Sequence, residues 1–254
     1  MKSLCAAITF LTILPLPSAW CGGQDDMARS LTWFPVVGLF IGIAVAAIDH
    51  FLLFLCGSPA VTSAITVVIL VAASGGLHLD GLGDSADAFM SSRGRERMLE
   101  IMKDSCCGPM AVYAIVAVIL LKFTALAALP QQLRSGVIIL TPVAGRCAIV
   151  INNVVLTYAR SDGGLATITN SSSRSWQAYA ALLLLLLSSL LFTGTIVTAL
   201  AITAGTAVFS LLFASRCRRI LGGLTGDTLG AVCELAELLP PLLALICWQQ
   251  GGFN

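Results

Sequence analysis

The sequence predicts an all-α integral membrane protein, a polytopic helical bundle of about seven transmembrane helices that forms one domain over residues 1–254. Two observations carry this prediction. The 254 residues are 57% hydrophobic and only 11% charged, with a mean hydropathy of +0.94, far from the composition of water-soluble domains. The hydrophobic residues also gather in runs of about 20, the length of helix that crosses ~30 Å of hydrocarbon.

The apolar runs, taken in order, give the spans. Residues 3–19 are apolar but contain Pro15 and Pro17, so we expect a short interfacial or re-entrant segment there, retained in the mature protein. The longer runs are 36–56, 60–75, 110–129, 136–156, 179–213 and 228–248. Run 179–213 is too long for one helix and has Gly194 near its middle, so we divide it in two. The total is seven spans, within a range of six to eight.

Basic residues orient these spans. Ten of them fall in alternate loops, namely Arg29, Arg93, Arg95, Arg97, Lys103, Arg160, Arg174, Arg216, Arg218 and Arg219. Only Arg134 falls on the opposite side. Positive residues favour cytoplasmic loops, which predicts cytoplasmic segments at about 77–109, 157–177 and 214–227. The net charge of +1 and the lack of a basic cluster argue against binding to nucleic acid.

The most informative motif is GGLHLDGLGDSADAF at residues 75–89, which spaces Asp80, Asp84 and Asp87 so that they share one face of a helix. Clustered carboxylates repel one another unless a cation neutralises them, and oxygen ligands suit Mg²⁺, Mn²⁺ or Ca²⁺. The glycines of the motif would let the backbone approach a ligand closely. His78 beside the acids is either a general base or a structural residue. The alternative to a metal site is a solvated acidic helix end.

A second acidic set, Asp227, Glu234 and Glu237, lies along the last span. Ionisable residues inside a span mark function by default, so we expect this set to join the aspartates at a metal or phosphate site. For Asp227 the alternative is a helix N-cap. Lys122 and Arg146, also within predicted spans, either pair with the glutamates or extend to an interface. The pattern GGLxxD recurs at 75–80 and 222–227 without similar flanks, which favours coincidence over an internal repeat.

Basic residues follow the aspartates in RGRERMLEIMKDSCCG, residues 93–108. Their positive charges, on Arg93, Arg95, Arg97 and Lys103, suit a pyrophosphate or a leaving phosphate, although the preference for positive residues in cytoplasmic loops would also explain them. Lys103 and Asp104 are the better placed, being next to a span. The nine cysteines of the chain lack metal-ligand spacing, and we interpret them as small apolar side chains rather than redox or metal groups.

Further motifs are FLTILPLP at 10–17, WFPVVGLFIG at 33–42, MKDSCCG at 102–108, YARSDGGL at 158–165 and GGLTGDTLGA at 222–231. With these motifs in this order, the chain resembles the adenosylcobinamide-GDP ribazoletransferase (cobalamin synthase) family over nearly its whole length. The resemblance implies a Mg²⁺-dependent transfer, with Mn²⁺ as an alternative metal. In it, α-ribazole or its 5′-phosphate attacks the pyrophosphate of adenosylcobinamide-GDP, expels GMP and gives adenosylcobalamin or its 5′-phosphate. It also implies a bacterial inner-membrane protein whose active site faces the cytoplasm.

On these motifs we predict that Asp80 and Asp84 hold Mg²⁺ on the pyrophosphate. Asp87 is then a third ligand or the base for the attacking ribose hydroxyl, and Lys103 steadies the leaving GMP. The expected substrate contacts are Arg93, Arg97, Asp104, Ser105, Arg160, Gly226 and Asp227, the further metal contacts are Asp227, Glu234 and Glu237, and His78 is a further candidate for catalysis.

Other functions are weaker matches to the sequence. A CDP-alcohol phosphotransferase would have Ala-Arg after Asp80-Gly81 and a later pair of spaced aspartates, and a prenyltransferase would have a second aspartate motif. A cation transporter would carry its acids near the membrane midplane, whereas these lie at the predicted cytoplasmic edge. Membrane lipid is an expected partner in every case, and homo-oligomer formation is left open.

Overall fold

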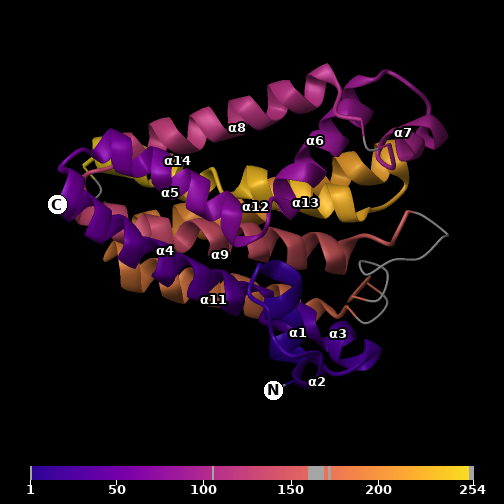
Figure 1. Cartoon of the computed structure of the whole chain (residues 1–254), viewed down its shortest axis with the longest axis horizontal. Helices are drawn as coiled ribbons and strands as arrows, with labels where there is room; N and C mark the ends of the chain where they lie inside the picture. The colour runs from indigo at the N-terminus through magenta and orange to yellow at the C-terminus, as the bar shows by residue number, and fades with distance from the viewer. Residues whose placement is uncertain (1, 105, 160–168, 171–172, 252–254) are drawn as a thin grey trace.

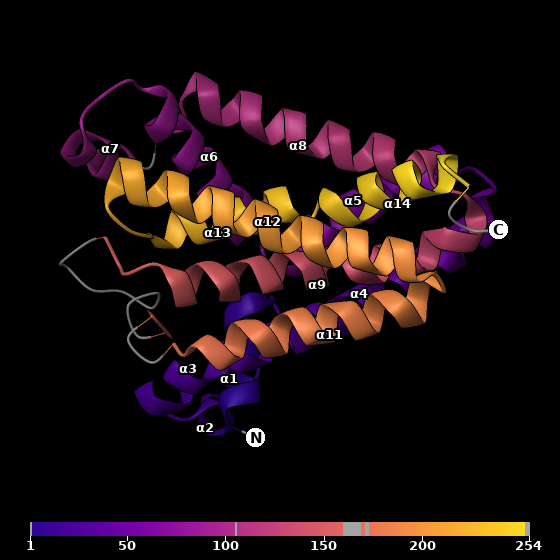
Figure 2. The same ribbon diagram turned by 180° about the vertical axis from the view of Figure 1, so that it is seen from behind.

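The chain is all helical in the computed structural model, which describes residues 2–104, 106–159, 169–170 and 173–251. The elements are α1 (Lys2–Leu11), α2 (Ser18–Cys21), α3 (Gln24–Ser30), η1 (Leu31–Trp33), α4 (Phe34–Cys56), α5 (Pro59–Ala73), α6 (Leu77–Met90), α7 (Arg95–Ile101), α8 (Pro109–Ala128), α9 (Gln131–Val155), α11 (Ser175–Thr193), α12 (Ile196–Leu221), α13 (Gly226–Ala236) and α14 (Leu239–Gln249). The long helices run side by side (Figures 1 and 2). Within the described ranges the only β-type pairing is an isolated bridge between Tyr158 and Leu224.

Six stretches of the described chain are long and apolar enough to cross a bilayer, and α5 with α6 makes a seventh if this bent pair is one span. The predicted polytopic bundle is therefore confirmed, and so is the division of the long run, because α11 ends at Gly194 with a φ of +70°. Two details differ from the prediction. At 15 residues, α5 covers only about 22 Å and turns by 88° into α6. The last span is also broken, between α13 and α14.

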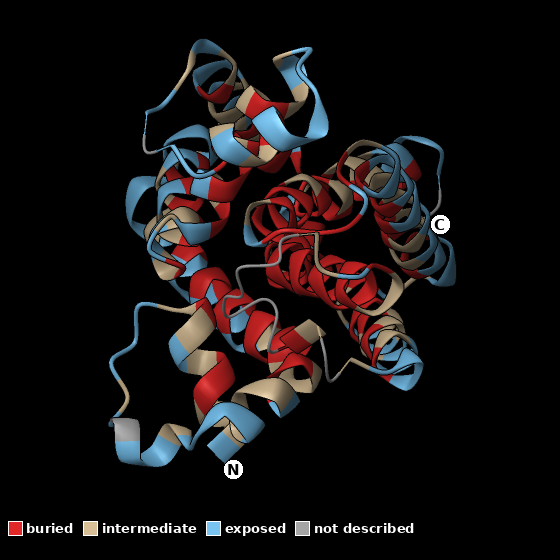
Figure 3. Cartoon of the chain, turned by 90° about the vertical axis from the view of Figure 1, so that its right-hand side faces the viewer, coloured by how far each residue is buried: buried red, intermediate tan, exposed pale blue. Residues whose placement is uncertain are grey.

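Helix α9 forms the centre of the bundle and is buried along most of its length. It contacts α4, α11, α12, α13 and α14, and Figure 3 shows the buried residues gathered on the central helices. Helix α4 approaches it closely through Gly38 and Gly42: a Cβ atom on Gly38 would lie 2.6 Å from the carbonyl oxygen of Pro142. Small residues at such contacts let transmembrane helices pack backbone to backbone.

The two ends of the bundle differ in chemistry. One end carries α1, α3, α6 and α7 (right half of Figure 1). Near the other end, Arg134 binds both oxygens of Asp49 at 2.8 and 2.7 Å, and Thr66 donates to the same carboxylate at 2.6 Å. Asp49 and Arg134 are buried, so Arg134 belongs to a structural ion pair inside the bundle rather than to a loop.

Candidate active site

Two cavities lie at the end of the bundle that carries α6, and Asp80 lines both. We call the first the aromatic cavity; it has a volume of about 240 Å³ and its wall includes Phe10, Phe34, Tyr158, His78, Asp80 and Asp227. The second, the charged cavity, has a volume of about 320 Å³ and its wall includes Asp80, Asp84, Lys103, Asp104 and Cys107. The structure therefore brings Lys103 to the first two aspartates, as the sequence predicts.

The aspartates owe their positions to the break between α5 and α6. Gly75 and Gly76 have φ values of +61° and +77°, a backbone conformation that glycine adopts without strain. Helix α6 then starts at Leu77, and Asp80 lies in its first turn, where the helix dipole favours a carboxylate. Asp84 follows one turn later, so the predicted helical spacing of the acids is confirmed.

The glycines of α6 line the cavities at Gly81 and Gly83 and also allow close contact with neighbouring helices. A Cβ atom on Gly81 would lie 2.7 Å from the carbonyl oxygen of Asp227, and one on Gly230 would lie 3.0 Å from that of His78. Gly81 and Gly230 therefore let α6 and α13 pack in contact. Gly83 likewise faces α8, with Ala111 3.2 Å from such an atom.

Helix α13 brings Asp227 to the same cavity as Asp80. Its N-cap is Thr225, whose hydroxyl accepts from the Thr228 backbone N–H at 3.2 Å, so Asp227 is not the cap. Asp227 lies in the first turn, as Asp80 does in α6. The two GGLxxD segments share a left-handed first glycine, Gly75 or Gly222, and an aspartate in the first turn of a helix, but α6 begins directly after Gly76 whereas α13 begins only at Gly226.

Asp87 has a structural role. One of its carboxylate oxygens accepts from the backbone N–H of Gly108 at 2.6 Å and the other from that of Ala111 at 2.9 Å. Asp87 therefore accepts from backbone N–H groups that have no partner within α8, and it fixes the segment that carries Lys103. Since Asp87 also lines neither cavity, we reassign it from metal ligand or base to positioning residue.

Asp104 shapes the loop beside Lys103. Its carboxylate accepts from the backbone N–H of Cys106 at 3.1 Å, and this hydrogen bond lowers the pKa of Asp104 below its ordinary value. The same carboxylate raises the pKa of the Cys106 thiol, which makes that cysteine a weaker nucleophile. Asp104 therefore stays ionised at neutral pH and contributes a third negative charge to the charged cavity.

Glu234 and Glu237 lie away from the aspartates, and their expected place in the metal site is corrected. Lys122 Nζ lies 2.6 Å from a carboxylate oxygen of each, and Arg146 forms an ion pair with Glu237. All four side chains are buried, and neither glutamate lines either cavity. The alternative that Lys122 and Arg146 pair with the glutamates is thus confirmed. These ion pairs link α8 and α9 to α13, whose C-cap residue is Glu237.

The remaining predicted substrate contacts do not all lie at the cavities. Arg93 and Arg97 are exposed, and Arg97 pairs with Glu100 at 2.7 Å. Gly226 lines the aromatic cavity, whereas Ser105 and Arg160 lie outside the described residues. Arg95, the remaining basic residue of this segment, donates from Nε to the carbonyl of Leu221 at 2.6 Å and from Nη2 to that of Ala159 at 2.8 Å.

Sequence reasoning missed the aromatic wall. Phe10 and Phe34 stack with ring centroids 5.8 Å apart, and together with Tyr158 they line the aromatic cavity. All three occur in the motifs of the family resemblance, but isolated aromatic residues in apolar runs give no signal of their own. Only the packing of α1 against α4 shows that they belong to a site.

The carboxylates of the charged cavity suit a Mg²⁺ ion that is bound together with a substrate. Within the described residues, no three His, Cys, Asp or Glu side chains converge closely enough to hold a metal by themselves. Mg²⁺, however, usually binds one or two carboxylates, substrate phosphates and water. Asp80 and Asp84 on the wall of one cavity, beside Lys103, provide that kind of site.

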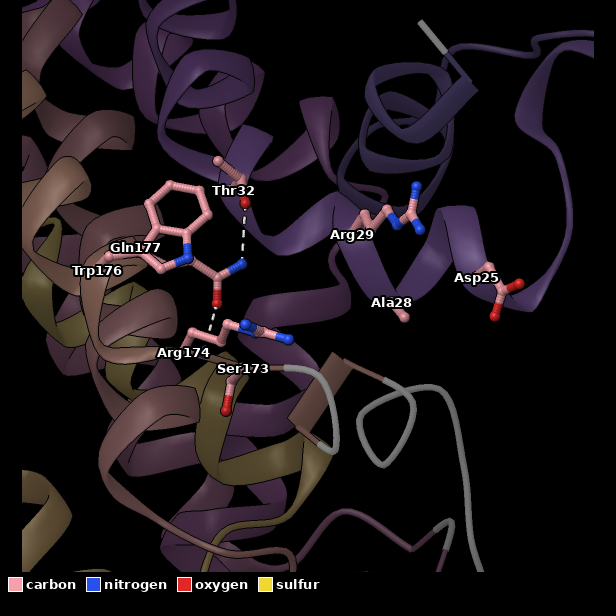
Figure 4. A pocket seen from close by; sticks show the side chains of 8 residues that line it. All are labelled: Asp25, Ala28, Arg29, Thr32, Ser173, Arg174, Trp176 and Gln177. Atoms are coloured by element: carbon pink, nitrogen blue, oxygen red, sulfur yellow. Dashed lines mark hydrogen bonds between the residues drawn. The ribbon is translucent and has the colours of Figure 1, made fainter.

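A third cavity, of about 600 Å³, lies between α3 and the start of α11. Figure 4 shows Arg29 and Arg174 at this cavity, with the amide of Gln177 donating to Thr32 Oγ1 at 2.9 Å. None of the residues on its wall lines the aromatic or the charged cavity. It is therefore separate from the candidate site.

Comparison with known proteins agrees with this geometry. Residues 3–246 match the family model described as cobalamin-5-phosphate synthase. The adenosylcobinamide-GDP ribazoletransferases of Acetivibrio thermocellus and Pseudomonas fluorescens are 34% and 38% identical to the chain, over 93% and 94% of its length and 94% and 96% of theirs. That of Pseudomonas putida (strain W619) is 39% identical, over 91% of this chain and 93% of its own. No solved structure matches. The chain thus belongs to the cobalamin-5-phosphate synthase family, the transferases that act in cobamide synthesis.

Proposed function

We propose that this membrane protein joins adenosylcobinamide-GDP to α-ribazole, or to α-ribazole 5′-phosphate, and releases GMP. The observation that carries the proposal is the sharing of Asp80 by two cavities, one aromatic and one charged. A transfer between two substrates needs two binding regions that meet where the bond is made. The names of the relatives supply the substrates.

In the proposed reaction, a ribose hydroxyl oxygen of the acceptor forms a bond to the phosphorus attached to cobinamide. The bond from that phosphorus to the bridging oxygen breaks, and GMP leaves with the bridging oxygen. The hydroxyl proton passes to a base in the aromatic cavity, for which His78 and Asp227 are the candidates. Lys103 faces the negative charge that develops on the leaving phosphate.

Asp80 and Asp84 are the residues that would hold Mg²⁺ in the charged cavity. A bound Mg²⁺ neutralises charge on the pyrophosphate oxygens. The two carboxylates would also repel the pyrophosphate in the absence of a cation, so they make its binding depend on the metal. Mn²⁺, which accepts the same oxygen donors, is expected to substitute.

We further propose that the cavities face the cytoplasm of a bacterial cell from its inner membrane. The support is the charge asymmetry: α3 and α7, which carry Arg29 and Arg95, lie at the same end of the bundle as α6, and Lys103 lines the charged cavity there. Soluble substrates would then reach the site directly. Labelling of an introduced cysteine at Glu96 in intact cells tests this orientation: a membrane-impermeant reagent should react only after the cells are opened.

Purified protein incubated with adenosylcobinamide-GDP, α-ribazole and Mg²⁺ tests the function. We expect equimolar GMP and a cobamide, measured by chromatography and mass spectrometry, with no product when the metal is chelated. The 5′-phosphate in place of α-ribazole should give the phosphorylated cobamide. Intact donor after incubation of folded protein with either acceptor would contradict the proposal.

A further inference from the structure

The two cavities that share Asp80 differ in what they can bind. The apolar part of the wall of the aromatic cavity includes Phe10, Phe34, Ile149 and Leu229. In contrast, the charged cavity presents carboxylates and an ammonium group. This difference separates a region for a flat apolar group from a region for phosphates.

We propose that the aromatic cavity binds the acceptor nucleoside, with its base against Phe10, Phe34 and Tyr158, and that the charged cavity binds the pyrophosphate of the donor. The assignment rests on the proposed function and goes beyond it, because it says which substrate occupies which cavity. It makes Phe10, Phe34 and Tyr158 the residues that bind the base.

The volume of the aromatic cavity supports the assignment. The aromatic cavity, at about 240 Å³, is smaller than the roughly 300–1,000 Å³ typical of pockets for drug-sized ligands. A nucleoside has about the right size for such a space. The corrin ring system of the donor is several times larger, so it has to remain outside, and only the pyrophosphate end of the donor can come near Asp80.

Hydrogen-bonding chemistry decides between the base of ribazole and the guanine of the donor. The ribazole base consists of two fused rings without exocyclic polar groups, whereas guanine carries several donors and acceptors. The amide of Asn153, on the cavity wall, already donates to Thr169 at 3.3 Å. The ribazole base needs no hydrogen-bond partner, so it leaves His78, Asp80 and Asp227 on the wall for the ribose, whereas guanine would compete with its own ribose for these groups.

The polar side of the aromatic cavity suits a ribose. His78 is 3% exposed, and its Nδ1 has no hydrogen-bond partner among the described residues. A ribose hydroxyl would supply such a partner. Asp80 and Asp227 line the same cavity, so a nucleoside whose base meets the phenylalanines places its sugar toward Asp80, where the charged cavity begins.

Substrate-specific kinetics test the assignment. For Phe10→Ala and, in a second wall element, Tyr158→Leu, we expect the KM for α-ribazole to rise by about 10-fold, as is usual when an aromatic partner of a base is removed. The KM for adenosylcobinamide-GDP should stay within about twofold. Lys103→Ala is the matched control and should raise the donor KM instead. A rise in the donor KM alone for both aromatic variants would overturn the assignment.

Cysteine protection gives a binding measurement that is independent of turnover. Cys107 is exposed and lines the charged cavity, so a maleimide should label it in a Cys106→Ser background, as followed by peptide mass spectrometry. We expect GDP with Mg²⁺ to slow labelling and α-ribazole alone to leave it unchanged. Protection by α-ribazole, or no protection by GDP, would overturn the assignment. If the unmodified enzyme instead releases no GMP with both substrates, the proposed function itself fails.

Discussion

Asp87 shows how one carboxylate can matter for activity without touching a substrate. It holds the backbone N–H groups of Gly108 and Ala111 at the start of α8. Hydrogen bonds to a charged group contribute about 1.5–3 kcal/mol each, so Asp87→Ala should lower the thermal stability clearly. Asp87→Asn, which keeps one acceptor oxygen, should do so less. The donor KM should rise in both variants, because the segment that carries Lys103 loses its anchor.

Glu100→Gln is the matched control for Asp87. Glu100 also carries a negative charge near this loop, but its partner is Arg97 in a pair whose side chains are 64% and 65% exposed. Exposed pairs contribute about 0–1 kcal/mol, so this variant should unfold at nearly the wild-type temperature in detergent. Equal stability of Asp87→Ala and Glu100→Gln would refute the anchoring role.

Single residues also show what the sequence could predict about the site. Asp80, Asp84 and Lys103 were predictable, because helical spacing and charge chemistry act over short distances along the chain. Glu234 and Glu237 were mistaken for metal ligands, since an acid in a span signals function or a buried ion pair equally well. Their cation, Lys122, is more than 100 residues away along the chain, and only the fold, which brings its Nζ within 2.6 Å of both glutamates, decides between the two.

At the scale of elements, the contact between α6 and α13 positions the paired aspartates. Gly81→Ala would place a methyl group 2.7 Å from the carbonyl oxygen of Asp227, a backbone atom that moves only if the helices separate. We expect this variant to lose most of its turnover, measured as GMP release, and to unfold at a lower temperature.

Gly226→Ala is the control for the helix contact. Gly226 lies at the start of α13, and a Cβ atom there would meet nothing within 4 Å. It should unfold at the wild-type temperature; because Gly226 also lines the aromatic cavity, the control concerns stability alone. If Gly81→Ala matched it in stability and also kept wild-type turnover, close packing of α6 and α13 would not be what positions the site.

Element boundaries were predictable where length alone decides them. The run at 179–213 exceeds one bilayer crossing, so a break at Gly194 followed directly. The 88° bend between α5 and α6 was not predictable, because the apolar run of α5 is nearly long enough to span. Its glycines, Gly75 and Gly76, are equally compatible with a ligand-binding loop. The bend packs α6 against α8 and α13.

At the scale of the whole molecule, a buried group of four charges links three helices. Lys122, Arg146, Glu234 and Glu237 balance one another and are hardly exposed. Removing one member of a buried pair costs about 3–5 kcal/mol. Lys122→Met should therefore destabilise the protein strongly, because it leaves Glu234 and Glu237 with Arg146 as the one remaining cation of the group.

A double variant distinguishes lost charge balance from lost packing. Lys122→Met with Glu234→Leu removes one charge of each sign and leaves Arg146 with Glu237. We expect it to recover much of the stability that Lys122→Met loses, as judged by thermal unfolding in detergent. Additive destabilisation in the double variant would show that the four residues do not act as one balanced group.

The central claim concerns Asp84, which we expect to make the binding of adenosylcobinamide-GDP depend on a metal ion. The most direct measurement is the rate of GMP release against Mg²⁺ concentration for the wild type, Asp84→Asn and the control Asp25→Asn, whose carboxylate lines the separate cavity of Figure 4. We expect Asp84→Asn to lose about 100-fold or more in kcat/KM at limiting Mg²⁺, with Asp25→Asn unchanged. Wild-type turnover by Asp84→Asn at limiting Mg²⁺ would contradict the central claim.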